Sequence, residues 1–440
     1  MGKGKSEINV GLLGWGTVGT GVSRILVNQK HRIYQNTGLN LNLLRIAKRT
    51  LPAYRSGIDL AENCLTTDVN AIVDNPDIEI VVELIGGTTD SLELISRAMQ
   101  NGKSIVTANK ALIAECGADL CQLAQKQEVS LKFEASTAGG IPIIKTLRES
   151  FAGNKVESIY GIVNGTCNYI LTEMQKNGRD FSEALEMAQD KGYAEEDPTL
   201  DLEGIDAAQK LTILTALAHH ISVPLNQVHT EGITKITQND IQYAQELGYA
   251  IKLLAITKLR ETQIDVRVHP TLIPNNSMLA NVSDAFNAVC VIGDAVGPTL
   301  FYGQGAGEMP TASAVVADII DAARSITGNS HLSIPPAWVS KPRSDFSIGS
   351  IDDIETRYYL RLVVRDCPGV LAQIGTILGN RDISIASVIQ KEPHCKDSVP
   401  LVILTHKACE ANMYLARIEI DNLEVVQEEL TLIRIEEFDF

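Results

Sequence analysis

The chain has 440 residues, of which 45% are apolar and 21% charged, and its formal net charge is −16. This length allows two or three domains with substantial cores. The negative charge argues against nucleic acid or an anionic membrane as the main partner, so small molecules are the expected ligands. No segment reaches the run of about 18 to 20 apolar residues that spans a bilayer, and the start MGKGKSEINVGLLG has no apolar signal core, so we expect a cytosolic protein.

The first segment, INVGLLGWGTVGTGVSRIL, predicts a strand over residues 8–13, a glycine turn and a helix. Such a turn lets the backbone approach a pyrophosphate at a helix N-terminus. Strands and helices then alternate, with segments at 78–87, 91–102, 104–109 and 129–136. Residues 1–136 are therefore expected to form a Rossmann-like, doubly wound dinucleotide-binding domain. Its predicted glycine-turn residues are Gly14, Gly16, Thr17, Val18 and Gly19.

The cofactor preference is predicted from residues after the second strand, 41–47. An NAD site usually carries Asp or Glu there, whereas this chain has Lys48 and Arg49. Because a guanidinium pairs well with phosphate, NADP is favoured over NAD, with two solvated basic residues as the plainer alternative. Ligands in such sheets lie beyond the carboxyl ends of the strands, which indicates Thr88 in IGGTT and Lys110 in VTANK.

The stretch GYAEEDPTLDLEGIDAAQK, residues 192–210, holds six carboxylates and one lysine. On a helical wheel the following helix has Gln209, Thr212, Thr215 and His219 on one arc, which predicts its solvent face. Asp206 and Lys210 lie one turn apart on the apolar side. The residues alone leave two alternatives for this pair: a structural salt bridge or a proton-transfer site.

A second domain over residues 137–327 is predicted from strand patterns at 250–259, 263–273, 287–294 and 299–307, mixed with helices. This α+β mixture favours an open sheet that covers the cofactor cleft. The eight cysteines show no CxxC pair or zinc-finger spacing, so we expect free buried thiols.

Six segments in order carry a family resemblance: GLLGWGTVG, VTANKALIA, FEASTAGGIPII, NGTCNYIL, GYAEEDPTLDLEGIDAAQK and YGQGAGEMPTASAVVADI. Over residues 8–325 the chain resembles homoserine dehydrogenase. The resemblance implies reversible hydride transfer between L-homoserine and L-aspartate 4-semialdehyde with NAD(P), on the route to threonine and methionine, and a second domain used for catalysis and dimerisation.

The resemblance also implies residue roles. Lys210 matches the proton-transfer lysine, and Lys110 a second lysine that reaches substrate and cofactor. Glu195 and Asp206 match residues that bind the substrate ammonium, and Asp201 one that orders water. The matching backbone positions near the cofactor are Gly192 and Gly307. The segment EASTAGGI matches a loop that holds a monovalent cation, expected to be Na⁺, through Glu134 and the carbonyls of Thr137, Gly139 and Ile141. A glycine-rich turn without an ion is the alternative.

Residues 328–355 predict a linker rich in Pro, Ser and Gly, and residues 356–440 a β-α-β-β-α-β, ferredoxin-like unit. The segment VVRDCPGVLAQIGTILGNRDISIASVIQ resembles an ACT domain, a module that commonly binds amino acids. The resemblance places an effector near Asp366 and Gly369 and implies a homodimer or homotetramer. Threonine feedback is the hypothesis, and an oligomerisation module without a ligand is the alternative.

Two other function classes stay open. A semialdehyde dehydrogenase would use a cysteine thiolate, and Cys167 at a predicted helix start suits that chemistry. A catalytically idle amino-acid sensor could combine a dinucleotide fold with an ACT module. The presence of both Lys110 and Lys210 argues against the idle sensor.

Overall fold

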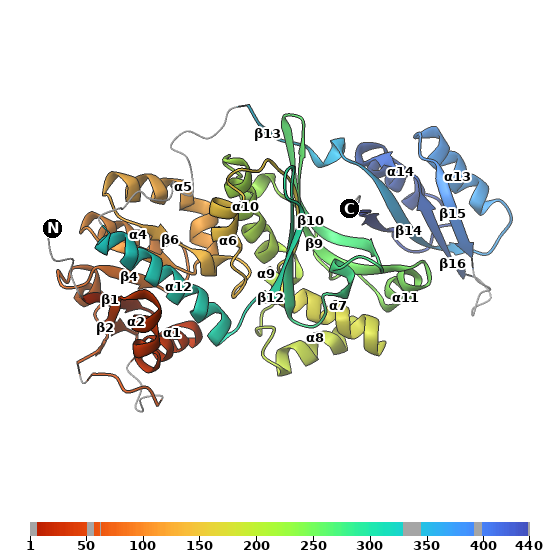
Figure 1. Ribbon diagram of the computed structural model, residues 1–440. Coiled ribbons are helices and arrows are strands. Elements are labelled where there is room, and N and C mark those ends of the chain that lie inside the picture. The colour runs from red at the N-terminus through yellow and green to blue at the C-terminus, as the bar shows by residue number, and fades with distance from the viewer. Residues whose placement is uncertain (1–6, 51–56, 62, 329–344, 391–397, 439–440) are drawn as a thin grey trace. The chain divides into compact units, whose positions relative to one another are not determined.

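The structure is a computed structural model that describes residues 7–50, 57–61, 63–328, 345–390 and 398–438 (Figure 1). The chain divides into two compact units. The first comprises residues 1–163, 208–228 and 286–346, and the second residues 164–207, 229–285 and 347–440.

A parallel sheet forms the centre of the first unit, in the order β3-β2-β1-β4-β5-β6. Its strands are β1 (Glu7–Leu13), β2 (Asn40–Ala47), β3 (Leu65–Thr66), β4 (Ile80–Glu83), β5 (Ser104–Thr107) and β6 (Leu131–Lys132). The helices between them are α1 (Thr17–Asn28), α2 (Lys30–Thr37), α3 (Asn70–Val73), α4 (Thr89–Gln100) and α5 (Lys110–Lys126). The predicted doubly wound fold is confirmed.

The last strand is shorter than its sequence predicts. Residues 129–136 were expected to form a strand, but only Leu131 and Lys132 do, and Glu134–Ser136 form a 3₁₀ turn. The backbone N–H of Glu134 donates to the Asp318 carboxylate at 2.7 Å rather than to a neighbouring strand. A contact so distant in sequence leaves no local signal.

A late helix completes the first unit. α12 (Glu308–Thr327) packs against α1, and Gly21 permits the approach, because a Cβ there would lie 2.9 Å from Ala312 Cβ. The same unit contains the antiparallel strands β7 (Val156–Ile162), β11 (Phe286–Gly293) and β12 (Gly297–Gln304), and the short helix α6 (Ile143–Lys145), which continues as a π turn to Ser150.

Strands β9 and β10 of the second unit form a long antiparallel pair, and the ferredoxin-like strands follow in the order β18-β14-β16-β15. The strands of this unit are β8 (His229–Thr230), β9 (Tyr249–Arg260), β10 (Gln263–Pro274), β13 (Ser347–Ile348), β14 (Glu355–Arg365), β15 (Ile385–Gln390), β16 (Ser398–Thr405), β17 (Ala408–Cys409) and β18 (Thr431–Ile435). Its helices are α7 (Gly165–Asn177), α8 (Phe181–Asp190), α9 (Thr199–Leu202), α11 (Gln238–Glu246), α13 (Val370–Asn380) and α14 (Glu410–Asp421).

The β14-α13-β15-β16-α14-β18 order confirms the predicted ferredoxin-like arrangement, and one apolar cluster joins its helices and strands. The predicted linker is only partly described, since residues 329–344 lie outside the described residues. Its later part was expected to lack regular structure, but β13 pairs with β10 and residues 351–353 form a 3₁₀ turn.

The prediction that Gln209, Thr212, Thr215 and His219 form the solvent face of α10 (Ile205–His219) is wrong. Thr212, Thr215 and His219 are 2%, 0% and 4% exposed, and only Gln209 of the four keeps partial exposure. The helix is apolar on most of its circumference, and such a helix is buried on all sides. The prediction that Asp206 faces inward is confirmed, because its side chain is 5% exposed.

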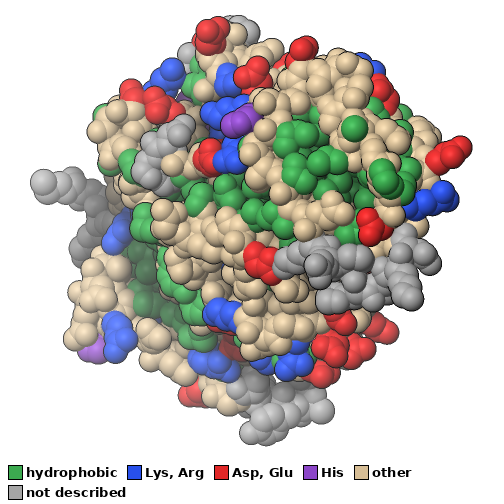
Figure 2. All heavy atoms as spheres, turned by 90° about the vertical axis from the view of Figure 1, so that its right-hand side faces the viewer, with side chains coloured by type: hydrophobic (Ala, Val, Ile, Leu, Met, Phe, Trp, Pro, Cys, Tyr) green, Lys and Arg blue, Asp and Glu red, His purple; other side chains and the backbone are tan. Residues whose placement is uncertain are grey.

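Among the described residues, no helix has the length and apolar character needed to cross a membrane. On the face shown in Figure 2, hydrophobic side chains gather at the upper right, and acidic and basic side chains lie mainly around them.

Candidate functional site

The predicted glycine turn joins β1 to α1. Gly14 has φ +101°, and a Cβ there would lie 2.7 Å from the Leu84 carbonyl oxygen. Gly16 is the N-cap of α1, which begins with Thr17 and Val18. A Cβ on Gly19 would lie 2.3 Å from the Gly14 carbonyl oxygen. The glycines therefore allow a tight turn of the kind that lets the backbone approach a pyrophosphate.

A cavity of about 690 Å³ lies beside this turn. Residues 14–16 and 47–50 line it, and Lys48 and Arg49 belong to that wall. The Lys48 ammonium lies 5.7 Å from the centre of the Trp15 ring, so a cation–π contact holds it there. Asp90 and Glu93 of α4 line the same cavity. The two predicted basic residues thus border a space suited to the adenosine half of a dinucleotide.

The loops after β4 and β5 are tied together by a residue that the sequence reasoning missed, Glu83. Its fully buried carboxylate accepts the backbone N–H groups of Ile85 and Gly86, at 2.8 and 3.0 Å, and the Thr107 hydroxyl at 2.6 Å. A glutamate that ends an apolar strand and precedes a double glycine is the signal that could have identified it.

Thr88 is the N-cap of α4, and Lys110 is the first residue of α5, where it is partly exposed. Asn109 caps α5 through the Leu112 N–H, and its amide donates to the Gly87 carbonyl at 2.6 Å. The two loops predicted to face the nicotinamide are therefore in direct contact with each other.

Lys210 lies in the second turn of α10, and its ammonium donates to the Val163 carbonyl at 2.7 Å. Val163 directly follows β7, so the end of that strand fixes the lysine's orientation. Lys210 is partly exposed.

Asp201 and Asp206 are joined by Asn164, another residue that the sequence reasoning missed. The Asn164 amide nitrogen donates to Asp201 at 2.7 Å and to Asp206 at 2.8 Å, and its oxygen accepts the Cys167 N–H. The Thr166 hydroxyl also lies 3.2 Å from Asp201. Asparagine before a helix is a common N-cap, which was the available signal. Two carboxylates thus lie side by side, and carboxylates are strong hydrogen-bond partners of an ammonium ion.

Two predicted residues of the acidic stretch are less closely tied to this pair. Glu195 is exposed on the loop between α8 and α9. Its backbone carbonyl accepts a hydrogen bond from the Gln189 side-chain amide. Gly192 has φ +73° on the same loop, and Gly307, with φ +121°, is the N-cap of α12. The described contacts do not link the Glu195 carboxylate to Asp201 or Asp206.

The Cys167 thiol is fully buried, and its Sγ lies 3.1 Å from the Asp201 carbonyl oxygen, to which it donates. This contact uses the thiol proton, whereas a nucleophilic cysteine needs an accessible thiolate. The geometry therefore argues against the thiohemiacetal alternative.

The predicted cation loop, residues 134–141, folds back on itself. Both Glu134 carboxylate oxygens accept backbone N–H groups, from Ile144 and Lys145, each at 2.8 Å. Burial raises the pKa of Glu134, although these two N–H groups oppose the change. Gly139 has φ +53°, and a Cβ there would lie 2.4 Å from the Gly305 carbonyl oxygen. The Thr137 hydroxyl is buried without a hydrogen-bond partner among the described atoms.

These residues fit a hard cation. Each Glu134 oxygen keeps lone-pair capacity, and backbone carbonyls are hard ligands. In the described residues no three His, Cys, Asp or Glu side chains gather as a metal cluster.

Sequence comparison supplies the deciding observation. Residues 142–320 match the family model of homoserine dehydrogenase, residues 14–134 that of the homoserine dehydrogenase NAD-binding domain, and residues 358–424 that of the ACT domain. The chain is 44% identical to a homoserine dehydrogenase of Pseudomonas aeruginosa, over 98% of this chain and 99% of the relative. The chain belongs to the homoserine dehydrogenase family.

Two further members agree with this assignment. A homoserine dehydrogenase of Neisseria gonorrhoeae is 44% identical, over 98% of each chain. The crystal structure of a homoserine dehydrogenase from Thiobacillus denitrificans matches with a TM-score of 0.92 and 46% identity, over 99% of both chains. These matches confirm the resemblance inferred from six motifs. Homoserine dehydrogenases are oxidoreductases that act on a CH–OH group. The nicotinamide cofactor and the C-terminal ACT domain are confirmed with it.

Proposed function

We propose that the protein interconverts L-homoserine and L-aspartate 4-semialdehyde, with Lys210 as the proton-transfer residue. The single observation that carries this proposal is the placement of α10. Its first turn presents Asp206, which Asn164 holds beside Asp201, and its next turn presents Lys210, which Val163 orients. An ammonium-binding carboxylate and a proton donor on one rigid helix suit an amino-acid aldehyde.

The bound nicotinamide supplies or accepts the hydride. During reduction Lys210 gives a proton to the aldehyde oxygen as that oxygen gains negative charge, and during oxidation it takes the proton back. Asp206 and Glu195 bind the substrate ammonium, Asp201 orders a water molecule, and Lys110 reaches substrate and cofactor. For Glu195 this role requires the exposed loop 191–198 to turn its carboxylate toward the substrate.

NADP is the proposed cofactor, because Lys48 and Arg49 line the cavity beside the glycine turn. Gly192 and Gly307 are proposed to approach the same cofactor. Glu134, Thr137, Gly139 and Ile141 are proposed to hold Na⁺. The role of that ion is structural, since Glu134 also anchors the start of α6.

The ACT domain is proposed to bind L-threonine near Asp366 and Gly369 and to lower activity when the pathway product accumulates. Gly369, with φ +93°, is the N-cap of α13, and Asp366 is exposed three residues before it. The proposed domains are residues 1–136, 137–327, 328–355 and 356–440, in a cytosolic homodimer or homotetramer.

One assay addresses most of these points. NADPH and NADH oxidation with aspartate semialdehyde should be compared, each with and without L-threonine and with NaCl replaced by choline chloride. We expect faster turnover with NADPH and inhibition by threonine. No oxidation of either cofactor would remove the proposed reaction, whereas oxidation without threonine inhibition and without threonine binding would remove only the proposed regulation.

A further inference from the structure

Trp15 lies between the two glycines that open the turn from β1 to α1, Gly14 and Gly16. Its side chain is 4% exposed and belongs to the apolar cluster that the parallel sheet shares with α1 and α12. Trp15 also lines the cavity of about 690 Å³ beside the turn. A side chain packed so closely keeps one orientation, so Trp15 is a fixed part of the cavity wall.

The indole N–H of Trp15 is buried and has no hydrogen-bond partner among the described atoms. An unpaired buried donor lowers stability, and a leucine or phenylalanine would fill an apolar position without that cost. The packing of the turn therefore does not by itself explain a tryptophan. The π face of the indole ring offers an explanation, because indole attracts a cation more strongly than the rings of tyrosine and phenylalanine do.

The cation on this ring is Lys48, whose ammonium lies 5.7 Å from the ring centre. The backbone fixes both partners. The Gly14 N–H donates to the Ala47 carbonyl at 3.0 Å, and the residue after Ala47 is Lys48. The Lys48 N–H donates in turn to the Thr66 carbonyl at 3.0 Å. Because Lys48 lines the same cavity and is partly exposed, the ring holds an accessible ammonium beside the glycine turn.

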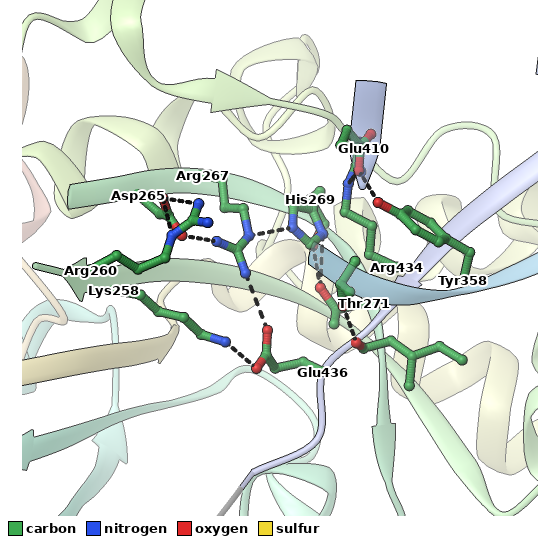
Figure 3. A network of polar contacts seen from close by, with 12 residues as sticks. Lys258, Arg260, Asp265, Arg267, His269, Thr271, Tyr358, Glu410, Arg434 and Glu436 are labelled. Atoms are coloured by element: carbon green, nitrogen blue, oxygen red, sulfur yellow. Dashed lines mark hydrogen bonds and ion pairs between the residues drawn. The ribbon is translucent and has the colours of Figure 1, made fainter. Parts of the chain in front are cut away.

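Cations with a structural role are held differently in this chain. Figure 3 shows Lys258 and Arg267 reaching one carboxylate, that of Glu436, which is 5% exposed and neutralises both. In the part of the chain that the structure describes, no carboxylate lies within ion-pair distance of the Lys48 ammonium. A neutral ring does not compete with an anion for this ammonium, whereas a carboxylate would. The charge of Lys48 is therefore available to a ligand.

We propose that Trp15 positions the Lys48 ammonium for the 2′-phosphate of NADP and so contributes to the choice between NADP and NAD. NAD carries a hydroxyl at this position, so a fixed ammonium strengthens the binding of the phosphorylated cofactor far more. Trp15 acts through Lys48 and is a positioning residue. The inference rests on the proposed NADP preference and adds Trp15 to the residues on which that preference depends, Lys48 and Arg49.

The test is calorimetric titration of the full-length enzyme with NADPH and, separately, with NADH. The variants are Trp15→Leu, which removes the π face, Trp15→Phe, which keeps a weaker one, and Lys48→Met, alone and combined with Trp15→Leu. Tyr34→Leu, which removes an exposed aromatic ring from α2, is the matched control. The NADH titration shows whether each variant has kept the glycine turn, and Trp15→Phe makes the same comparison if Trp15→Leu does not fold.

Trp15→Leu should raise the Kd of NADPH about 3- to 30-fold, the range expected for the loss of a cation–π contact, and that of NADH less than about twofold. Trp15→Phe should lie between wild type and Trp15→Leu, and Tyr34→Leu should match wild type. In the Lys48→Met background, Trp15→Leu should change the Kd of NADPH less than about twofold, because the ring then has no cation to hold.

Equal losses for both cofactors in Trp15→Leu would overturn the inference, since Trp15 would then only shape the turn. A loss of NADPH affinity that persists in the Lys48→Met background would overturn it too. If the wild type prefers NADPH and Trp15→Leu keeps that preference, the inference falls and the NADP proposal stands. A wild type that binds NADH as tightly as NADPH would remove the NADP proposal, and the inference with it.

Discussion

Asp201 and Asp206 are held side by side by a single buried amide. Asn164 donates one N–H to each carboxylate, at 2.7 and 2.8 Å, and is itself 4% exposed. Two like charges so close would repel each other without a shared donor. The amide lowers that cost and fixes both carboxylates on α9 and α10, and its oxygen also caps α7.

Asn164→Asp separates these roles, because aspartate can still cap α7 but cannot donate to the two acids. We expect kcat/KM for homoserine to fall about 100-fold, since small misplacements of positioning groups cost that much, while NADPH affinity stays unchanged. Steady-state kinetics and cofactor titration measure both. Asn177→Asp, at the exposed end of the same helix and next to Glu173, is the matched control. Near-wild-type activity in Asn164→Asp would exclude a positioning role.

Arg49→Ala should weaken NADPH binding about 10- to 100-fold, the loss expected for a charge-assisted contact of about 1.5 to 3 kcal/mol, and should change NADH binding no more than about threefold. Fluorescence titration of both cofactors gives the two constants. Lys126→Ala, at the exposed end of α5, is the control. Equal losses for both cofactors would show that Arg49 does not recognise the 2′-phosphate.

Glu134→Gln keeps the acceptor oxygen and the size of the side chain but removes its charge. If Glu134 binds Na⁺, NaCl should raise the melting temperature of the wild type above its value in choline chloride of equal concentration, and this difference should shrink in the variant. Glu149→Gln, an exposed glutamate of the following turn, should keep the full difference. A wild type that melts identically in both salts contradicts the cation site.

Lys252 is a buried ammonium in β9, 1% exposed, which donates to the Val282 carbonyl at 2.6 Å and to Asn168 at 3.2 Å. Burial, with Lys176, lowers its pKa from 10.5 to about 8. Between pH 8 and 10.5 the unfolded chain therefore holds a proton that the folded chain has released, so stability rises with pH in this window and is flat below it.

A rise of about 2 to 3 kcal/mol follows from a shift of this size, and Lys252→Met should abolish it. Thermal melts of both proteins at pH 7.5, 9 and 10 measure the difference between them. A constant difference across the series would mean that Lys252 keeps its ordinary pKa.

The sequence correctly predicted those elements whose structure depends on residues close to one another in the chain. The strand, GxGxxG and helix near residue 14 form as expected because glycine spacing and apolar alternation act within a few residues. The predicted solvent face of α10 was incorrect because its threonines and histidine were assigned to solvent by their polarity, whereas the surrounding structure buries them. The hydrophobic periodicity of a sequence describes the faces of the helix itself and carries no information on which elements pack around that helix.

The roles of Asn164 and Glu83 depend on partners up to 42 residues away, so no sequence window contains them. The helical wheel correctly predicted that Asp206 faces inward, but the resemblance, and not the wheel, supplied the proposed functions of Asp206 and Lys210. Lys252 interrupts an apolar strand, and that interruption was the only local sign of a buried ammonium.

Single-turnover reduction of aspartate semialdehyde by NADPH in Lys210→Ala tests the central claim most directly. If Lys210 transfers the proton, the rate should fall about 1,000-fold, with NADPH affinity retained, and added ethylamine should restore part of it in proportion to the free-amine concentration. Lys126→Ala should react at the wild-type rate. A Lys210→Ala rate within threefold of wild type, insensitive to ethylamine, would contradict the account.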